Sequence, residues 1–103
     1  MKVGLSTWSL LKIELIRSIE LICESGLQSI ELWGEPPHAY PGRTNVAAVR
    51  DALSQYDVEV SVHGPFHDLN PGSVYRPLSE SVSRTLKEFV RFAEKIGATT
   101  ITF

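Results

Sequence analysis

Four short strand-like apolar runs alternate with three helical patterns along this chain of 103 residues. The strand runs cover residues 3–7, 29–33 and 58–62, and a last one begins at Thr99. Alternating strands and helices are typical of βαβ units, in which the strands are parallel and each crossover is right-handed. The pattern therefore predicts an α/β fold with a parallel sheet and the order β-α-β-α-β-α-β.

The three helices are predicted from apolar residues that recur every three or four positions. The first covers residues 11–24, and the second follows Thr44 or Asn45, which are both good N-cap residues. The third begins with Ser79 as its N-cap and ends at Gly97, which suits a left-handed cap. Its expected buried stripe consists of Val82, Leu86, Phe89, Val90, Ala93 and Ile96.

Composition excludes several classes of protein. A hydrophobic content of 43% is ordinary for a chain that forms a core, and a net charge of -2 without a basic stripe argues against a nucleic-acid partner. No apolar run approaches the roughly 18 residues that a membrane span needs, and the N-terminus lacks a signal-peptide pattern. The single cysteine, Cys23, cannot form an internal disulfide, so we expect a buried thiol in a cytoplasmic protein.

The most distinctive segment follows the third predicted strand. His63 ends the apolar run, and Gly64 and Pro65 then break the strand. Parallel α/β folds place their chemistry at the carboxyl ends of strands, so we expect His63 to face a binding site. A neutral imidazole also suits a metal ion, which makes His63 the candidate metal ligand. The alternative is a structural histidine bonded to the neighbouring loop.

Four further residues are candidates for binding a substrate. Glu31 stands among apolar residues near the end of the second strand, where a carboxylate is costly to bury unless it is paired. We expect it to pair with His63 and fix its tautomer, or else to be a surface carboxylate. Trp8 and Trp33 each follow a strand. We expect them either to form aromatic walls of the binding site or simply to cover the end of the fold. Arg76 suits a substrate phosphate, although a solvated loop charge is the simpler interpretation.

The remaining polar residues of the two long loops have simpler interpretations. We expect Asp68 or Asn70 to organise the loop after His63 through Asx-turns, and His38 to be a surface histidine in a proline-rich loop. No Gly-x-Gly-x-x-Gly motif follows the first strand, so a dinucleotide-binding fold is disfavoured.

The chain resembles the N-terminal half of the xylose-isomerase-like (β/α)8 barrels. This superfamily contains sugar-phosphate isomerases and epimerases and the abasic-site nucleases of the endonuclease IV type. The matching segments are residues 3–7, 30–33, 62–66 with its His-Gly-Pro-Phe element, 68–70 and 93–100. A complete barrel needs about 250 residues. The resemblance therefore implies that residues 1–103 are the N-terminal half of a TIM barrel and end after its fourth strand.

The resemblance also implies a function for the intact protein. It predicts an enzyme that isomerises or epimerises a sugar or sugar phosphate with a divalent metal (Mn, Co, Mg or Zn), while carboxylates move protons. The first alternative is an endonuclease IV-like nuclease, in which the histidine at this position binds zinc. The second is a half-barrel that self-associates without catalysis. Because a metal site needs three or four ligands, we expect no complete site and no activity in the fragment alone.

Self-association is expected from the edges of the sheet. The first and fourth strands would each have an unpaired edge, and such edges invite pairing with another chain. We also expect the apolar side chains of Leu5, Ile30, Val60 and Ile101 to face the interior of the barrel and to lie partly uncovered.

Overall fold

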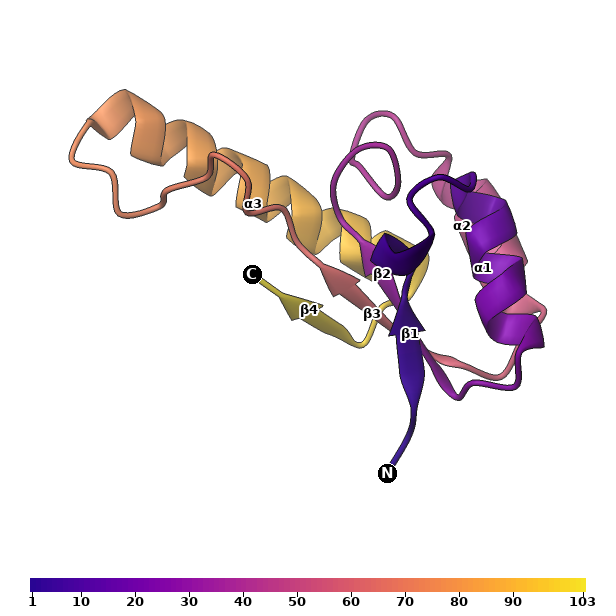
Figure 1. The fold of residues 1–103 in the computed structure, drawn as a ribbon. Coiled ribbons are helices and arrows are strands. Elements are labelled where there is room, and N and C mark those ends of the chain that lie inside the picture. The colour runs from indigo at the N-terminus through magenta and orange to yellow at the C-terminus, as the bar shows by residue number, and fades with distance from the viewer.

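The computed structural model describes all of residues 1–103 and shows a four-stranded parallel sheet with three helices (Figure 1). In sheet order the strands are β1 (Gly4–Ser6), β2 (Ser29–Trp33), β3 (Glu59–His63) and β4 (Thr100–Thr102). The consecutive strands are connected by α1 (Leu15–Glu24), α2 (Val46–Ser54) and α3 (Arg76–Ile96), and a 3-10 turn, η1 (Thr7–Leu10), follows β1. The predicted α/β class and element order are confirmed.

The sheet has one face covered by helices and one uncovered face. Successive side chains of a strand point to opposite faces, so each strand contributes alternate residues to each face. On the uncovered face the register places Glu31 beside Ser61 and Trp33 beside His63. The covered face packs against apolar residues of all three helices. From β2 and β3 it contains Ile30, Leu32, Val60 and Val62.

The expectation that four apolar strand residues face the interior of a barrel is wrong. The register pairs Leu5 with Ile30, Ile30 with Val60, and Val62 with Ile101, which places all of them on the helix-covered face. Ile30 is fully buried, whereas Leu5 on the edge strand β1 is 40% exposed. The uncovered face is instead polar near its centre. Self-association therefore stays a prediction that rests on the open edges of β1 and β4.

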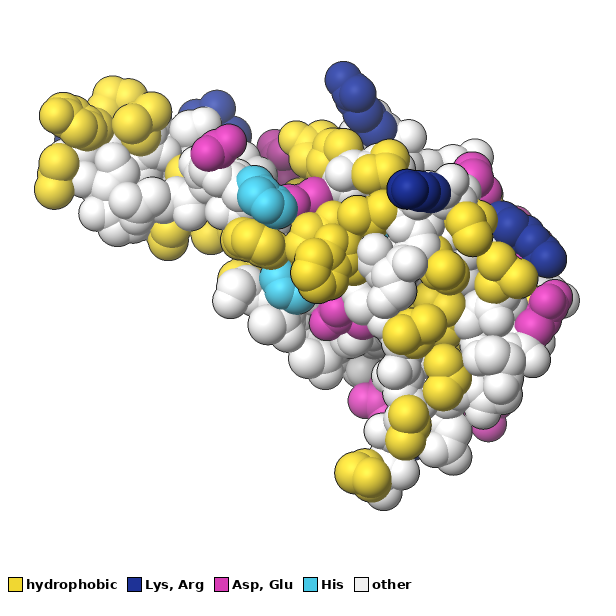
Figure 2. Space-filling view, viewed as in Figure 1, with side chains coloured by type: hydrophobic (Ala, Val, Ile, Leu, Met, Phe, Trp, Pro, Cys, Tyr) yellow, Lys and Arg dark blue, Asp and Glu magenta, His cyan; other side chains and the backbone are white.

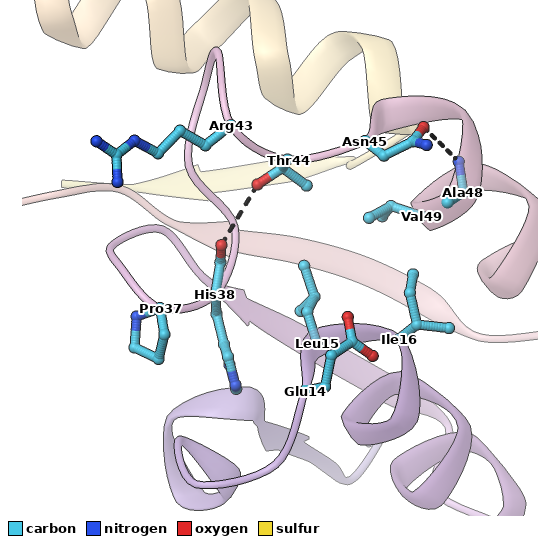
Figure 3. A pocket seen from close by; sticks show the side chains of 10 residues that line it. All are labelled: Glu14, Leu15, Ile16, Pro37, His38, Arg43, Thr44, Asn45, Ala48 and Val49. Atoms are coloured by element: carbon cyan, nitrogen blue, oxygen red, sulfur yellow. Dashed lines mark hydrogen bonds between the residues drawn. The ribbon is translucent and has the colours of Figure 1, made fainter.

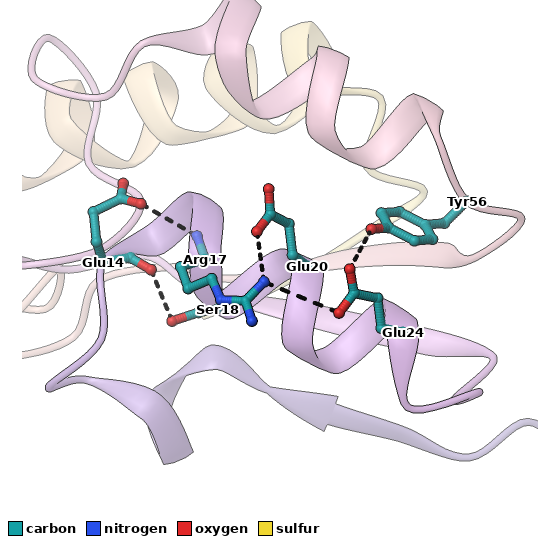
Figure 4. Close-up of polar contacts among 6 residues, drawn as sticks. All are labelled: Glu14, Arg17, Ser18, Glu20, Glu24 and Tyr56. Carbon is teal, nitrogen blue, oxygen red and sulfur yellow. Dashed lines mark hydrogen bonds and ion pairs between the residues drawn. The ribbon is translucent and has the colours of Figure 1, made fainter.

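The helix α1 begins at Leu15, later than the predicted residue 11, because residues 11–13 form a turn after η1 and Glu14 has a non-helical backbone conformation. Glu14 is its N-cap, and the Glu14 carboxylate accepts a hydrogen bond from the Arg17 backbone N–H at 3.2 Å (Figure 4). The Arg17 guanidinium pairs with Glu20 at 2.9 Å on the solvent face. Such exposed pairs contribute little to stability, so α1 is held mainly by its buried face.

The other two helices show which cap residues are used. Asn45, rather than Thr44, caps α2 by accepting a hydrogen bond from the backbone N–H of Ala48 at 3.1 Å. The prediction of Ser79 as the cap of α3 is wrong, because α3 already begins at Arg76. A proline in the first turn suits this earlier start, since its missing N–H would have no helical partner there.

The buried stripe of α3 differs from the prediction at two positions. Val82, Phe89, Ala93 and Ile96 are buried as predicted, but Leu86 is only half-buried and Val90 is 48% exposed. Phe92 takes its place in the core, because positions three apart share a helix face and Phe92 lies three residues after the buried Phe89.

The buried thiol predicted for Cys23 is confirmed. Burial raises the pKa of the Cys23 thiol, and the nearby Glu24 carboxylate raises it further. None of the helices is long and apolar enough to cross a membrane. A cytoplasmic location stays a prediction.

The contrast between two neighbouring residues of α3 tests this packing. The Phe89 ring is fully buried and packs edge-on against Tyr40, with 5.9 Å between ring centroids. We expect Phe89→Ala to lower the free energy of unfolding by about 3–5 kcal/mol, through lost burial and a residual cavity. Val90→Ala is the control and should change it by less than about 0.5 kcal/mol. Urea denaturation measures both, and equal losses would contradict the packing described here.

Candidate functional site

Aromatic rings gather where β1, β2 and β3 end. Trp33, the last residue of β2, is nearly buried, and its ring stacks on Trp8 with 5.4 Å between centroids. The rings of His63 and Phe66 also pack against Trp33, at 5.0 and 5.6 Å. Trp8 is 61% and Phe66 47% exposed. We call the rings of Trp8, Trp33, His63, Phe66 and His67 the aromatic wall.

The surface view shows the same arrangement. Exposed histidine side chains lie beside hydrophobic ones on this face of the molecule, with acidic groups close by (Figure 2). Exposed aromatic faces next to imidazoles are suited to a ligand that has both C–H surfaces and hydroxyl groups.

Backbone contacts fix the place of the wall. The Thr7 hydroxyl, fully buried, accepts a hydrogen bond from the Trp33 backbone N–H at 2.9 Å and so ties η1 to the end of β2. The Gly34 N–H donates to the His63 carbonyl at 2.7 Å. A Cβ at Gly34 would collide with that carbonyl and with the Phe89 ring, so only glycine allows the strand ends to approach this closely.

His63 lies at the carboxyl end of β3, on the uncovered face and half-buried. Its Nδ1 lies 2.9 Å from the carbonyl oxygen of Gly64. Because a carbonyl can only accept, Nδ1 carries the proton in this contact, and the neutral ring keeps a lone pair on Nε2. The arrangement allows Nε2 to bind a metal ion or to accept a hydroxyl proton. The predicted position of His63 is confirmed, and its role stays a prediction.

The expected pair between Glu31 and His63 does not form. The register places Glu31 beside Ser6 and Ser61, while His63 is level with Trp33. Glu31 therefore lies two residues earlier on the same face, which is roughly 6.6 Å along a strand. His63 instead donates a hydrogen bond from Nδ1 to the backbone carbonyl of Gly64.

The structure does not bring Arg76 to the aromatic wall. Arg76 is the first residue of α3, whose start projects beyond the sheet (Figure 1). Its side chain is 87% exposed and pairs with Glu80 at 2.7 Å. The simpler interpretation, a solvated charge, agrees with this position.

Glu35 is the residue that sequence reasoning missed. Its side chain is almost buried, and its Oε1 accepts hydrogen bonds from the backbone N–H groups of Phe66 at 2.8 Å and His67 at 2.9 Å. Its Oε2 accepts a further one from Nδ1 of the His67 ring. Glu35 thus ties the loop after β2 to the loop after β3. An acid directly after a buried strand, between Gly34 and Pro36, was the available signal.

The electrostatics of Glu35 follow from these bonds. Burial alone would raise the pKa of its carboxyl group, because it disfavours the charged form. The hydrogen bonds from the His67 backbone and ring and from the Phe66 backbone outweigh burial, and the pKa is lowered below its ordinary value of 4.5. The carboxylate is therefore the form that holds the two loops together.

A cavity of about 470 Å³ opens between these two loops and α3. Glu35 and His67 line it together with Tyr40, Arg43 and Thr85. It lies next to the aromatic wall, because His67 belongs to both. A ligand on the wall would therefore have polar groups within reach on this side.

His38 is not the surface residue that we expected. It is buried, and its Nε2 donates a hydrogen bond to the Ile13 carbonyl at 2.9 Å, while its own carbonyl accepts one from the Thr44 hydroxyl at 3.3 Å (Figure 3). It lines a cavity of about 300 Å³ between the starts of α1 and α2. His38 thus joins the loop after β2 to the start of α1.

The loop after β3 contains the predicted Asx-turn. The Asn70 side-chain oxygen accepts a hydrogen bond from the Gly72 N–H at 3.0 Å. Asp68 has a φ of 58°, in the left-handed region that aspartate tolerates in turns.

A complete metal site does not fit the residues of this chain. No three His, Cys, Asp or Glu side chains lie close enough together to hold a metal ion. His63 offers a single nitrogen, whereas a catalytic metal needs about three protein ligands.

Comparison with known proteins agrees with the fold. No protein-family model matches the chain. The uncharacterized protein MJ1311 of Methanocaldococcus jannaschii is 34% identical over 93 residues, which are 90% of this chain and 30% of that protein. A solved structure, a D-tagatose 3-epimerase-like protein, matches with a TM-score of 0.82 and 27% identity.

That match covers 98% of this chain and 36% of the solved one. This chain thus spans about a third of the length of both relatives. The structural match confirms the resemblance to the xylose-isomerase-like TIM barrels and the half-barrel architecture.

The lowered pKa of Glu35 predicts how stability depends on pH. A group with a lowered folded-state pKa stabilises the fold fully above its unfolded value and loses that contribution as pH falls through its folded value. We expect Glu35→Gln to be about 1–2 kcal/mol less stable than wild type at pH 7, because charge-assisted hydrogen bonds are lost. The difference should shrink progressively below about pH 4.5.

Urea denaturation between pH 3 and 7 measures this difference. Glu88→Gln removes an exposed helix carboxylate and serves as the control, which should follow the wild-type curve. A difference between Glu35→Gln and wild type that stays constant down to pH 3 would contradict the role given to the Glu35 carboxylate.

Proposed function

We propose that this chain forms part of an enzyme that isomerises or epimerises a sugar or sugar phosphate. The observation that carries the proposal is the aromatic wall with the free Nε2 of His63, placed at the carboxyl ends of parallel strands. In barrels of this kind the active site lies at those strand ends. The likeness to a D-tagatose 3-epimerase-like protein supports ketohexoses as the first substrates to test.

The residues of the wall have distinct roles in this proposal. Exposed faces of Trp8 and Phe66 would contact the C–H surface of a sugar, while Trp33 holds them in place from below. The Nε2 atom of His63 would accept a hydrogen bond from a sugar hydroxyl or bind a metal ion. Glu31 lies on the same face of the sheet, two residues before Trp33. It would contact a substrate that extends beyond the aromatic wall in that direction.

A divalent metal is part of the proposal, with His63 as its candidate ligand in this chain. Such an ion polarises a carbonyl or hydroxyl oxygen of the substrate when it is bound. An endonuclease IV-like activity has less support, because the aromatic wall contains no lysine or arginine and the chain carries a net charge of -2.

Substitution of His63 tests the proposed function. We expect His63→Gln, made in the intact protein, to lower kcat/KM for ketohexose epimerisation at least tenfold, which corresponds to about 1.4 kcal/mol of transition-state stabilisation. The free energy of unfolding should fall by less than about 1 kcal/mol, because His63 is not part of the core. Asp57→Asn, at the opposite end of the sheet, is the control and should keep wild-type activity.

Two outcomes separate the possible roles of His63. If His63→Gln loses bound metal, His63 is a metal ligand. If the variant retains metal but binds the sugar more weakly, His63 contacts the substrate in the pocket. Full activity combined with a loss of several kcal/mol of stability would show that His63 is structural and would contradict the proposal.

A further inference from the structure

We propose that Glu35 and His67 form a carboxylate–imidazole pair, in which Glu35 holds the ring so that Nε2 of His67 accepts a hydrogen bond from a substrate hydroxyl group. The hydroxyl-bearing substrate rests on the proposed function. The pair itself rests on the geometry of the two loops after β2 and β3.

The bonds of Glu35 determine where the proton of His67 lies. Both carboxylate oxygens are engaged, because Oε1 accepts the backbone N–H groups of Phe66 and His67 and Oε2 faces Nδ1 of the His67 ring. An ionised carboxylate can only accept, so Nδ1 must carry a hydrogen. In the neutral ring Nε2 then has a free lone pair, as in the oriented histidines of metal sites and catalytic triads.

The surroundings of His67 fix the plane of the ring and leave its outer edge open. The ring stacks on Phe66 at 4.4 Å between centroids, and its edge faces the indole of Trp33 at 6.4 Å. The side chain is nevertheless 67% exposed. No hydrogen bond within the chain engages Nε2, and His67 lines the cavity that Tyr40 and Arg43 also line.

Two oriented imidazoles therefore flank one exposed aromatic ring. Phe66 lies 5.5 Å from the His63 ring and 4.4 Å from the His67 ring. In both histidines a fixed acceptor holds Nδ1, a carbonyl for His63 and a carboxylate for His67. Two acceptors beside a flat apolar face match a polyhydroxylated molecule, whose C–H surface covers the ring while two hydroxyl groups donate.

A purely structural role explains less of this geometry. The two backbone N–H bonds would be enough for Glu35 to tie the loops together. The third bond orients a ring that is mostly exposed, and ordering an exposed side chain costs conformational entropy. The arrangement is the one expected of a preorganised contact to a ligand.

Glu35→Gln separates the two roles of the carboxylate. The glutamine oxygen can replace Oε1 and keep both backbone bonds, while its NH₂ group takes the place of Oε2. This NH₂ group would donate to Nδ1 of His67, so the ring proton should move to Nε2. The variant should therefore invert the His67 tautomer while the loop stays in place.

Two-bond 1H–15N correlation spectra of the imidazoles at pH 8 report the tautomers directly. We expect the Nδ1–H form of His67 in the wild-type protein and the Nε2–H form in Glu35→Gln, with His63 unchanged in both as an internal control. An Nε2–H tautomer of His67 in the wild type, or the same tautomer in both proteins, would overturn the pair.

The contact to substrate is tested separately. In the intact protein we expect KM for a ketohexose to rise at least fivefold in Glu35→Gln and in His67→Phe, which keeps the stacking on Phe66 but removes the acceptor. Unchanged KM values in both variants would overturn the contact even if the tautomer is as proposed. If the wild-type protein neither binds nor converts ketohexoses, the proposed function and the contact fail, while the tautomers still decide the pair.

Discussion

The packing of three helices onto one face of the sheet determines which side chains the other face presents. The covered face is a layer of branched apolar side chains, with Ile30 and Val60 in one row and Leu32 and Val62 in the next. Because strand side chains alternate, burying these residues determines every residue on the other face. A slip of one residue would bury the polar side chains and expose the apolar ones. The core thus positions the site without contacting a ligand.

The loops after β2 and β3 form the surface at the carboxyl ends of the strands. Gly34 allows the ends of β2 and β3 to approach closely, and the next residue, Glu35, bonds to the neighbouring loop. Trp33, immediately before them, anchors the rings of the aromatic wall. Three consecutive residues at the end of β2 therefore anchor the aromatic wall, allow the close approach of the strands and connect the two loops. Their joint effect gives the two loops a defined arrangement.

The fold could be predicted from the sequence because it depends on local patterns. The periodicity of apolar residues identified all seven main elements, and Gly97 marked the end of α3. The wrong predictions concern positions at which tertiary contacts determine which side chain is buried or where a helix begins. Val90 and Phe92 are both apolar, and only packing selects which of them is buried. Arg76 was assigned to a loop because Ser79 is a good cap, although the proline between them is equally suited to a first turn.

The candidate site was predictable in position and less so in its contacts. A histidine followed by glycine and proline marked the end of β3, but the partner of a side chain depends on the register. Glu31 seemed close to His63 because the two strands are neighbours, and the register separates them. Glu35 was missed since two of its three partners are backbone N–H groups in a loop 31 and 32 residues away, which carry no signal in side-chain type.

In the proposed function a sugar binds at the carboxyl ends of the strands, against the aromatic wall. Titration of the 15N-labelled protein with a ketohexose, followed by backbone amide chemical shifts, tests it most directly. We predict saturable shifts at Trp8, Trp33 and Phe66, and none at Gln28 and Asp57, which lie at the opposite end of the sheet. Shifts at Gln28 and Asp57 without shifts at the wall, or no shifts at any ketohexose concentration, would contradict the account.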